Sequence, residues 1–126
     1  MKIVVDRTEA RRALAARSDS APQMLALLAQ DGSAAVRRAV AGNPQAGDEL
    51  LGMLANDVEP NVRMAVAGNP ATPPETLCAL AADPAEPIRA RIVRHPSTSP
   101  QALAALANDI DEDIRRNVAA RSDVAI

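Results

Sequence analysis

The sequence predicts an all-α protein, an α-solenoid in which short helix pairs stack on one another. First, Asp31, Asp57, Asp83 and Asp109 recur every 26 residues, and an arginine follows each of them by six positions. A fixed period of this length indicates stacked units. Second, hydrophobic residues make up 48% of the chain, yet it contains no Phe, Trp or Tyr. Ala, Leu, Val, Ile and Met must therefore build the core, and such side chains favour thin, closely stacked helices.

The period divides the chain into repeats within a single domain, residues 1–126. The first repeat is degenerate, because Arg11, Leu14, Leu25 and Leu28 stand where the next unit has its arginine and its core residues. Terminal repeats are expected to be atypical, since one side faces solvent. The predicted units are a degenerate repeat at 7–30, full repeats at 31–56, 57–82 and 83–108, and an incomplete repeat at 109–126.

Within one repeat, the first helix is predicted from its start and its apolar face. Asp57 and Pro60 are typical of a cap and a first turn. Val62, Ala65 and Val66 then fall at i, i+3 and i+4, on one face of a helix. Each helix should be only about eight to ten residues long, below the length at which an isolated helix is stable. The units must therefore stabilise one another.

Asn69-Pro70 ends this first helix, because proline disfavours helical backbone in the residue before it and Asn tolerates the left-handed conformation. Thr72 is expected to cap a second helix, with Glu75 as its capping-box partner. The buried face of this second helix is expected to be Leu77, Leu80 and Ala81. The same core positions recur in the other units as Val36, Val62, Ile88 and Ile114; Val40, Val66, Ile92 and Val118; Leu51, Leu77 and Leu103; and Leu54, Leu80 and Leu106.

The motif Val-Arg-Arg-Ala-Val-Ala-Gly-Asn-Pro at 36–44 returns as Val-Arg-Met-Ala-Val-Ala-Gly-Asn-Pro at 62–70. These residues resemble the leucine-rich repeat variant family, and the resemblance covers roughly residues 7–126. It implies a right-handed superhelix that alternates α-helices with 3₁₀ or short α pieces. The pattern is also similar to HEAT repeats, in which an aspartate in the turn and an arginine in the following helix form a ladder of hydrogen bonds between units.

The resemblance implies a structural role for the recurring aspartates and for the arginines that follow them. As an alternative, the arginines form a row that binds anions. Arginine forks bridge carboxylates and turn carbonyls well. We therefore expect a structural ladder of Asp31, Arg37, Asp57, Arg63, Asp83, Arg89, Asp109 and Arg115. Some members of the variant family carry an N-terminal iron–sulfur cluster, but such a cluster needs about four thiolates. This chain has one cysteine, Cys78, so we expect no cluster and no other cofactor.

A second column, one residue further on, varies between units as an adapted binding surface would: Arg12, Arg38, Met64, Ala90 and Arg116. Four positions later stand Ala16, Gly42, Gly68, Arg94 and Ala120, on the adjacent part of the helix surface. In HEAT-like solenoids this helix lines the concave face. The candidate partner-binding residues are Arg12, Arg38, Met64, Arg91, Arg94 and Arg116. An ordinary solvated helix face is the alternative interpretation.

Other reactive side chains have simpler interpretations. His95 replaces the Asn of the earlier units and is expected to bond free carbonyls at a helix end. Cys78 is expected to be a small apolar filler. Asp109, Asp111, Glu112 and Asp113 precede a helix whose positive end they complement, and they lack the Gly and Glu of a calcium loop. We expect no catalytic and no metal-binding residue.

The function expected from these observations is a non-catalytic interaction module that binds a protein or peptide, on its concave face. The alternative is binding of nucleic-acid phosphates through the same arginines. Sixteen acidic residues against 14 basic ones, and the lack of aromatic residues for base stacking, weigh against it. The lack of stacking side chains also argues against an enzyme such as a base-excising glycosylase, so we expect no enzyme.

We expect a cytoplasmic protein with no membrane contact, because a lone cysteine argues against disulfide bonding and no apolar run suffices to cross a bilayer. Val118 and the apolar tail at 124–126 further suggest a homo-oligomer that forms through exposed terminal repeats.

Overall fold

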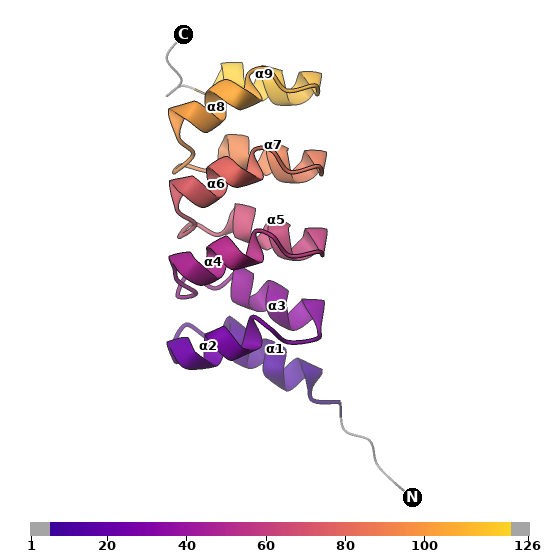
Figure 1. Cartoon of the computed structure of the whole chain (residues 1–126), viewed down its shortest axis with the longest axis vertical. Coiled ribbons are helices and arrows are strands. Elements are labelled where there is room, and N and C mark those ends of the chain that lie inside the picture. The colour runs from indigo at the N-terminus through magenta and orange to yellow at the C-terminus, as the bar shows by residue number, and fades with distance from the viewer. Residues whose placement is uncertain (1–5, 122–126) are drawn as a thin grey trace, which may run out of the picture.

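The computed structural model describes residues 6–121, and that range contains nine α-helices and no strand. Their bounds are α1 Thr8–Ala16, α2 Pro22–Leu28, α3 Ala34–Ala41, α4 Asp48–Leu54, α5 Pro60–Gly68, α6 Pro74–Leu80, α7 Glu86–Arg94, α8 Pro100–Leu106 and α9 Glu112–Ala120. Figure 1 shows them as a column of helix pairs rising from the N-terminus to the C-terminus. The prediction of an all-α helical-repeat solenoid is confirmed.

The helices form two layers. The odd-numbered helices pack directly on one another in the order α1, α3, α5, α7 and α9, and we call them the odd layer. The even-numbered helices α2, α4, α6 and α8 form the even layer, whose members contact one another much less. In Figure 1 the even layer lies in front and the odd layer behind it. Each of the first four units thus contributes one helix to each layer, and the described part of the last unit contributes only α9.

Every described helix is an α-helix, and none is 3₁₀. The even helices have only seven residues. Each ends with one i→i−4 backbone hydrogen bond, which two i→i−3 backbone hydrogen bonds follow. In α4 these bonds join the Ala55, Asn56 and Asp57 amides to carbonyls of Leu51, Met53 and Leu54. Of the two alternatives that the family resemblance left open, 3₁₀ or short α pieces, residues 6–121 contain short α-helices with tightened last turns. No helix in that range has the length and apolar character that a membrane span requires.

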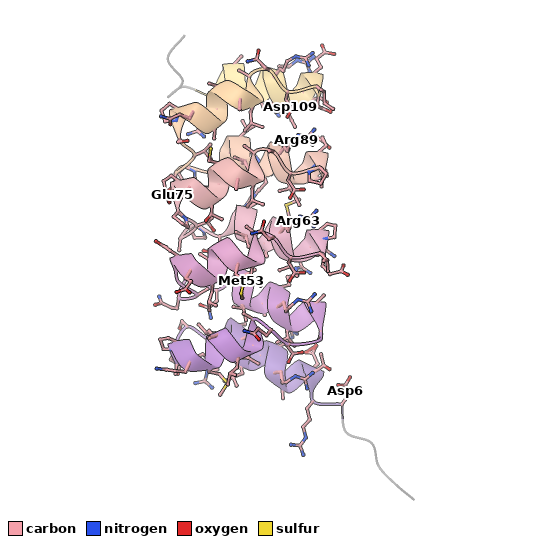
Figure 2. The ribbon with its side chains drawn as sticks, viewed as in Figure 1. Asp6, Met53, Arg63, Glu75, Arg89 and Asp109 are labelled. Atoms are coloured by element: carbon pink, nitrogen blue, oxygen red, sulfur yellow. The ribbon has the colours of Figure 1, made fainter. Side chains whose placement is uncertain are left out.

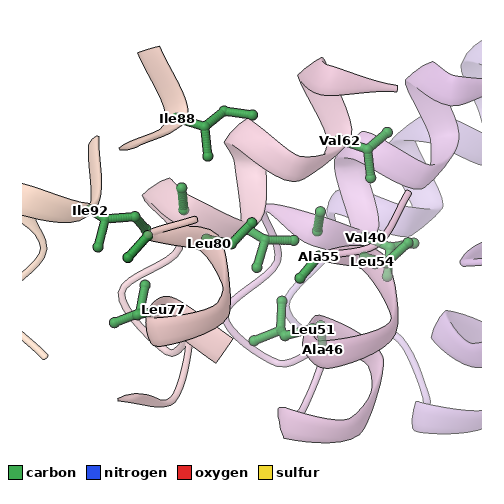
Figure 3. Close-up of a cluster of buried hydrophobic side chains, with 14 of the residues drawn as sticks. Val40, Ala46, Leu51, Leu54, Ala55, Val62, Leu77, Leu80, Ile88 and Ile92 are labelled. Carbon is green, nitrogen blue, oxygen red and sulfur yellow. The ribbon is translucent and has the colours of Figure 1, made fainter. Parts of the chain in front are cut away.

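The core is a continuous apolar seam between the two layers, part of which is drawn in Figure 3. All four predicted core columns are buried, and none of their members is more than 5% exposed. In the degenerate first unit Leu25 and Leu28 are buried as well. Burying one such side chain contributes roughly 1.5–3 kcal/mol. Because every seam residue contacts neighbouring units, helices too short to be stable alone are stabilised by stacking.

Two local expectations are wrong. The N-cap of α6 is Pro73 and accepts no side-chain bond, so Thr72 and Glu75 form no capping box. The Thr72 hydroxyl instead donates to the Val66 carbonyl, at 2.7 Å, and thereby closes the preceding helix. Asn69 is extended rather than left-handed, with φ −76°. Among the described residues only Gly47 has a positive φ, of 86°, in the loop before α4.

The expectations for Cys78 and Val118 are also corrected. Cys78 is exposed on α6, because the helix directs its neighbour Leu77 into the seam instead. Val118 is only 3% exposed, packed within the last unit. It therefore offers no apolar surface for a second copy, and the tail at 124–126 lies outside the described residues.

Candidate functional site

The arginine that follows each turn aspartate joins two consecutive units. In α3, Arg37 Nε donates to Asp57 Oδ2 at 2.8 Å and Nη2 donates to Asp57 Oδ1 at 3.2 Å. Arg37 Nη1 donates to the backbone carbonyl of Asp31, the aspartate of its own unit, at 2.8 Å. One guanidinium thus holds the carboxylate of the next turn and the backbone of its own.

This arrangement repeats along one edge of the stack, where Figure 2 labels Arg63, Arg89 and Asp109 in succession. Arg63 pairs with Asp83 and Arg89 with Asp109, each with an Nε–Oδ2 distance of 2.8 Å. The six-residue spacing seen in the sequence therefore separates each arginine from the aspartate whose backbone carbonyl it contacts. The charged contact runs 20 residues onward, to the aspartate of the following unit.

The aspartates are engaged on their other side as well. In each turn the Oδ1 atom accepts the backbone N–H two residues onward, as Asp57 does from Glu59 at 3.0 Å. The same bond forms at Asp31, Asp83 and Asp109. The arginine hydrogen bond, followed by the backbone bond, lowers the pKa of Asp31, and Arg89 acts likewise at Asp109. At Asp57 burial raises the pKa, but the bonds from Arg37 and the Glu59 amide outweigh it and the pKa is lowered.

The two ends of the ladder are weaker than its middle. Arg11 in α1 pairs with Asp31, a pair that the sequence prediction omitted, and its side chain is 42% exposed. In the last unit Arg115 is exposed, and the bond it is seen to make is to the Asp109 carbonyl. By contrast, the Arg63 and Asp83 side chains are 14% and 5% exposed. The ladder residues are hydrogen-bonded within the fold, which leaves the inner ones few free donors for a ligand.

A second ladder of hydrogen bonds runs through the residues that the sequence analysis treated only as helix stops. Asn43 Nδ2 donates to the Ala15 carbonyl at 2.9 Å and to the Arg17 carbonyl at 2.8 Å. Asn69 makes the same two bonds one unit later, to Ala41 and Asn43. The members of this ladder recur with the period, since Asn43, Asn69 and His95 are 26 residues apart, but the period does not show which carbonyls they bond.

His95 is buried and replaces asparagine in this second ladder. Its Nδ1 accepts the Ser97 backbone N–H at 3.0 Å, so the ring proton must lie on Nε2. Nε2 then donates to the Asn69 carbonyl at 2.7 Å. Both ring nitrogens are in use, in agreement with the expectation that His95 bonds free carbonyls at a helix end. An imidazole has one donor where asparagine has two, so the bond equivalent to Asn69–Ala41 is not formed.

The predicted partner-binding residues lie on the odd layer but differ in their contacts. Arg12 pairs with Glu9 on its own helix, and Arg116 pairs with Glu112 and Asp113. Met64 is half-buried and packs against the core. Arg38, Arg91 and Arg94 form no hydrogen bond or ion pair with any part of the chain that the structure describes. The candidate surface therefore contains three uncommitted guanidinium groups.

Two hollows lie beside these uncommitted arginines. A groove of about 530 Å³ crosses α1, α3 and α5, and its lining includes Arg12, Ala16, Ala35, Arg38, Ala39 and Gly42. A smaller pocket of about 270 Å³ lies between the C-terminal ends of α5 and α7, lined by Gly68, Pro70, Arg91, Arg94, His95 and Pro96. Small side chains line the groove, so a bound segment could approach the helix backbones closely.

The acidic run before α9 has a structural role. The Asp111 side chain accepts the backbone N–H groups of Asp113 and Ile114 and so caps the helix. Within residues 6–121 no three potential metal-ligating side chains gather as a metal site would require. Cys78 lies on α6 of the even layer, whereas the arginine pocket is formed by α5 and α7.

Comparison with known proteins agrees with this architecture. The family model described as leucine rich repeat variant matches residues 34–59 and 60–85, two consecutive units of the same 26-residue period. A solved structure, described as a leucine-rich repeat variant with a novel repetitive protein structural motif, is similar with a TM-score of 0.70 and 30% sequence identity. The match covers 87% of this chain and 43% of that chain. A search of curated proteins gives no match. The two matched units carry the repeat of the leucine-rich repeat variant family, and the similarity to the solved variant structure extends over most of this chain.

Proposed function

We propose that this chain is a non-catalytic binding module that holds a peptide segment of a partner protein along its odd layer. The observation that carries the proposal is the groove across α1, α3 and α5, where alanine and glycine residues surround the uncommitted Arg38. Small residues let a ligand backbone come close, and one unpaired guanidinium supplies a directional contact. Solenoids commonly use such extended surfaces for binding.

The packing of the two layers supports the choice of this face. Consecutive odd helices contact one another along the stack, whereas consecutive even helices contact one another little. A stack whose units lie closer on one side curves toward that side. The odd layer is then the inner, concave side, where a segment contacts several units at once.

The chemistry of the described side chains supports a non-catalytic role. A nucleophile needs an adjacent base with a free lone pair. Both ring nitrogens of His95 are engaged, and Cys78 is on the even layer. The inner carboxylates of the ladder are held by arginines and backbone amides. Neither hollow on the odd layer combines a free base with a nucleophile.

The distribution of acidic residues favours a peptide over nucleic acid. Glutamates stand at or near the N-terminal ends of four odd helices: Glu9, Glu59, Glu86 and Glu112. A phosphate backbone that followed the odd layer would meet these carboxylates along one edge. The chain carries a net charge of −2 and has no aromatic side chain on which bases could stack.

A photo-crosslinking amino acid at two exposed alanines tests the proposal. Ala35 lines the groove on α3, and Ala79 lies on α6 in the even layer. A partner protein that crosslinks from position 35 but not from position 79 is the expected result. Equal labelling from both positions, or labelling from 79 alone, contradicts it. Retardation of a 20-base-pair DNA duplex with crosslinking at position 35 would replace the peptide proposal with the nucleic-acid alternative.

A further inference from the structure

We propose that Arg91 and Arg94 form a receptor for the carboxylate of an Asp or Glu side chain on the bound peptide. This inference rests on the proposed peptide-binding function and specifies the chemistry of the segment that the odd layer binds. It assigns a specificity-determining role to the pocket between the C-terminal ends of α5 and α7.

The two arginines distinguish α7 from the earlier odd helices. They are three residues apart and therefore lie on one face of the helix. At the corresponding positions, one and two units earlier, α5 and α3 carry only small residues: Ala65 and Gly68, and Ala39 and Gly42. The pocket therefore has one wall of charged side chains and one of nearly bare helix.

Arg91 reaches from α7 across to α5. A methyl group built on Gly68 would lie 3.4 Å from both Nε and Nη2 of Arg91. The missing side chain at Gly68 thus leaves the room in which the guanidinium lies. Arg91 is half-buried there, so its position is restricted more than that of an ordinary surface arginine.

Neither guanidinium group has an acceptor in the described part of the chain. Arginines in the last turn of a helix often bond its free carbonyls. At the end of α7 three nearby carbonyls accept bonds from other donors. The Ile92 carbonyl accepts the Thr98 hydroxyl at 2.6 Å, and the His95 N–H also reaches it. The carbonyls of Val93 and His95 both accept Arg121 Nη1, at 2.8 and 3.0 Å.

A carboxylate fits this arrangement. Each guanidinium offers planar, paired N–H donors that match the two oxygens of a carboxylate. Two arginines that line one pocket supply enough charge for one such anion, whereas Glu86 at the start of α7 and Glu59 before α5 oppose a long polyanion. Ala65 lies beside the main groove and Gly68 beside the pocket, one helical turn apart on α5. A single peptide can therefore occupy both.

The test compares two double variants that remove equal charge. R91A/R94A removes the uncommitted pair, whereas R7A/R17A removes two exposed arginines at the ends of α1 that line neither hollow. The probe is a fluorescein-labelled, end-capped decapeptide of alternating Glu and Ala, and its control has Gln in place of Glu. Dissociation constants are measured by fluorescence anisotropy at low salt, after equal denaturation midpoints have shown that the variants are folded.

We expect the Glu peptide to bind wild type and R7A/R17A equally and to bind R91A/R94A at least about tenfold more weakly, because charge-assisted bonds are lost. The Gln peptide should bind all three proteins with the weaker affinity. Gly68→Leu, which fills the pocket and keeps both charges, should weaken Glu peptide binding as well. Equal weakening by the two double variants would show a general charge effect and overturn the proposal.

Backbone amide shifts in ¹H–¹⁵N spectra separate failure of the receptor from failure of the binding function. If the Glu peptide shifts the amides of α3 and α5 but binds R91A/R94A as tightly as wild type, the receptor is wrong while the odd-layer function stands. If those amides do not shift and crosslinking from position 35 also fails, both the peptide-binding function and the arginine receptor are wrong. Tighter binding of a 20-base-pair duplex than of the Glu peptide would overturn the choice of a peptide carboxylate.

Discussion

Arg37 and Arg38 are neighbours on the same helix and have the same side chain, yet they have opposite environments. Arg37 is 16% exposed and donates to two groups in two units. Arg38 is exposed and has no partner in the described part of the chain. One step along an α-helix turns the side chain by about 100°. That rotation moves a guanidinium from the interface between units to the open surface of the odd layer.

The two columns differ in the same way along the whole molecule. At every 26-residue step, the position of Arg37 is occupied by an arginine: Arg11, Arg37, Arg63, Arg89 and Arg115. The position of Arg38 holds arginine, methionine or alanine. A residue that must hold the next unit is repeated, whereas a residue on the open surface can vary. Regularity, not residue type, therefore identifies the structural arginines.

The largest expected effect comes from replacing Arg37. Arg37→Ala leaves the Asp57 carboxylate, whose side chain is only 9% exposed, without its cation. Loss of one partner of a buried pair should lower the free energy of unfolding by about 3 kcal/mol. Urea denaturation followed by circular dichroism measures this loss.

Arg38→Ala is the matched control, and its effect should stay within about 0.5 kcal/mol. If both variants were destabilised equally, the division between structural and surface arginines would be wrong.

The pH dependence of stability should also differ between Arg37→Ala and Arg38→Ala. The folded-state pKa of Asp31, Asp57 and Asp109 lies below the ordinary value of 3.8. Their stabilising contribution is therefore complete above the unfolded pKa and is lost as the pH falls through the folded-state pKa. The contribution of these three carboxylates to stability should stay nearly constant down to about pH 5 and decrease below about pH 4.

In Arg37→Ala, burial of Asp57 is no longer offset by its guanidinium, so the decrease should begin at a higher pH than in wild type. Arg38→Ala should follow the wild-type curve. Denaturation midpoints measured at half-unit steps of pH test both statements, and a wild-type curve for Arg37→Ala would refute the first.

The end of the ladder should matter less than its middle. Arg11 makes the same kind of pair with Asp31, but its side chain is 42% exposed, so water competes for both charges. Arg11→Ala should therefore cost clearly less stability than Arg37→Ala. A loss as large as that of Arg37→Ala would mean that solvent exposure does not set the strength of these pairs.

The sequence was sufficient for the features that follow from period and pattern. The spacing correctly predicted the burial of Val62, Val66, Leu77 and Leu80. Each helix has one apolar face, and that face packs into the core between the two layers. The charged contact between Arg37 and Asp57 was harder to foresee. Nothing in a six-residue spacing shows that the carboxylate partner lies in the next unit.

Polar residues at helix ends were the main failure of sequence reasoning. Asn69 and Thr72 are compatible with several local roles, such as stop and cap, and the sequence offered no reason to prefer a contact with another unit. Their actual bonds, to Ala41 and to Val66, depend on where the stacked backbones place free carbonyls. The uncommitted state of Arg91 and Arg94 likewise depends on which carbonyls the fold has already used.

The smallest expected effect concerns the second ladder. In His95→Asn the amide oxygen replaces Nδ1 as acceptor for Ser97, and the amide group supplies two donors in place of one. The extra bond, equivalent to Asn69–Ala41, should raise the free energy of unfolding by about 0.5 kcal/mol. Thermal and urea unfolding check the sign. A loss of stability would show that the packing of the buried imidazole ring contributes more than the second hydrogen bond.

Hydrogen exchange at the arginine Nε–H groups tests the central claim most directly, because it observes both columns in the unmodified protein. The Nε–H groups of Arg37, Arg63 and Arg89 donate to aspartates that are at most 9% exposed, whereas those of Arg38, Arg91 and Arg94 have no acceptor in the described residues. We predict slow exchange and persistent ¹⁵N-correlated signals for the first three, and rapid exchange for the others. Equal exchange rates for Arg37 and Arg38 would contradict the account.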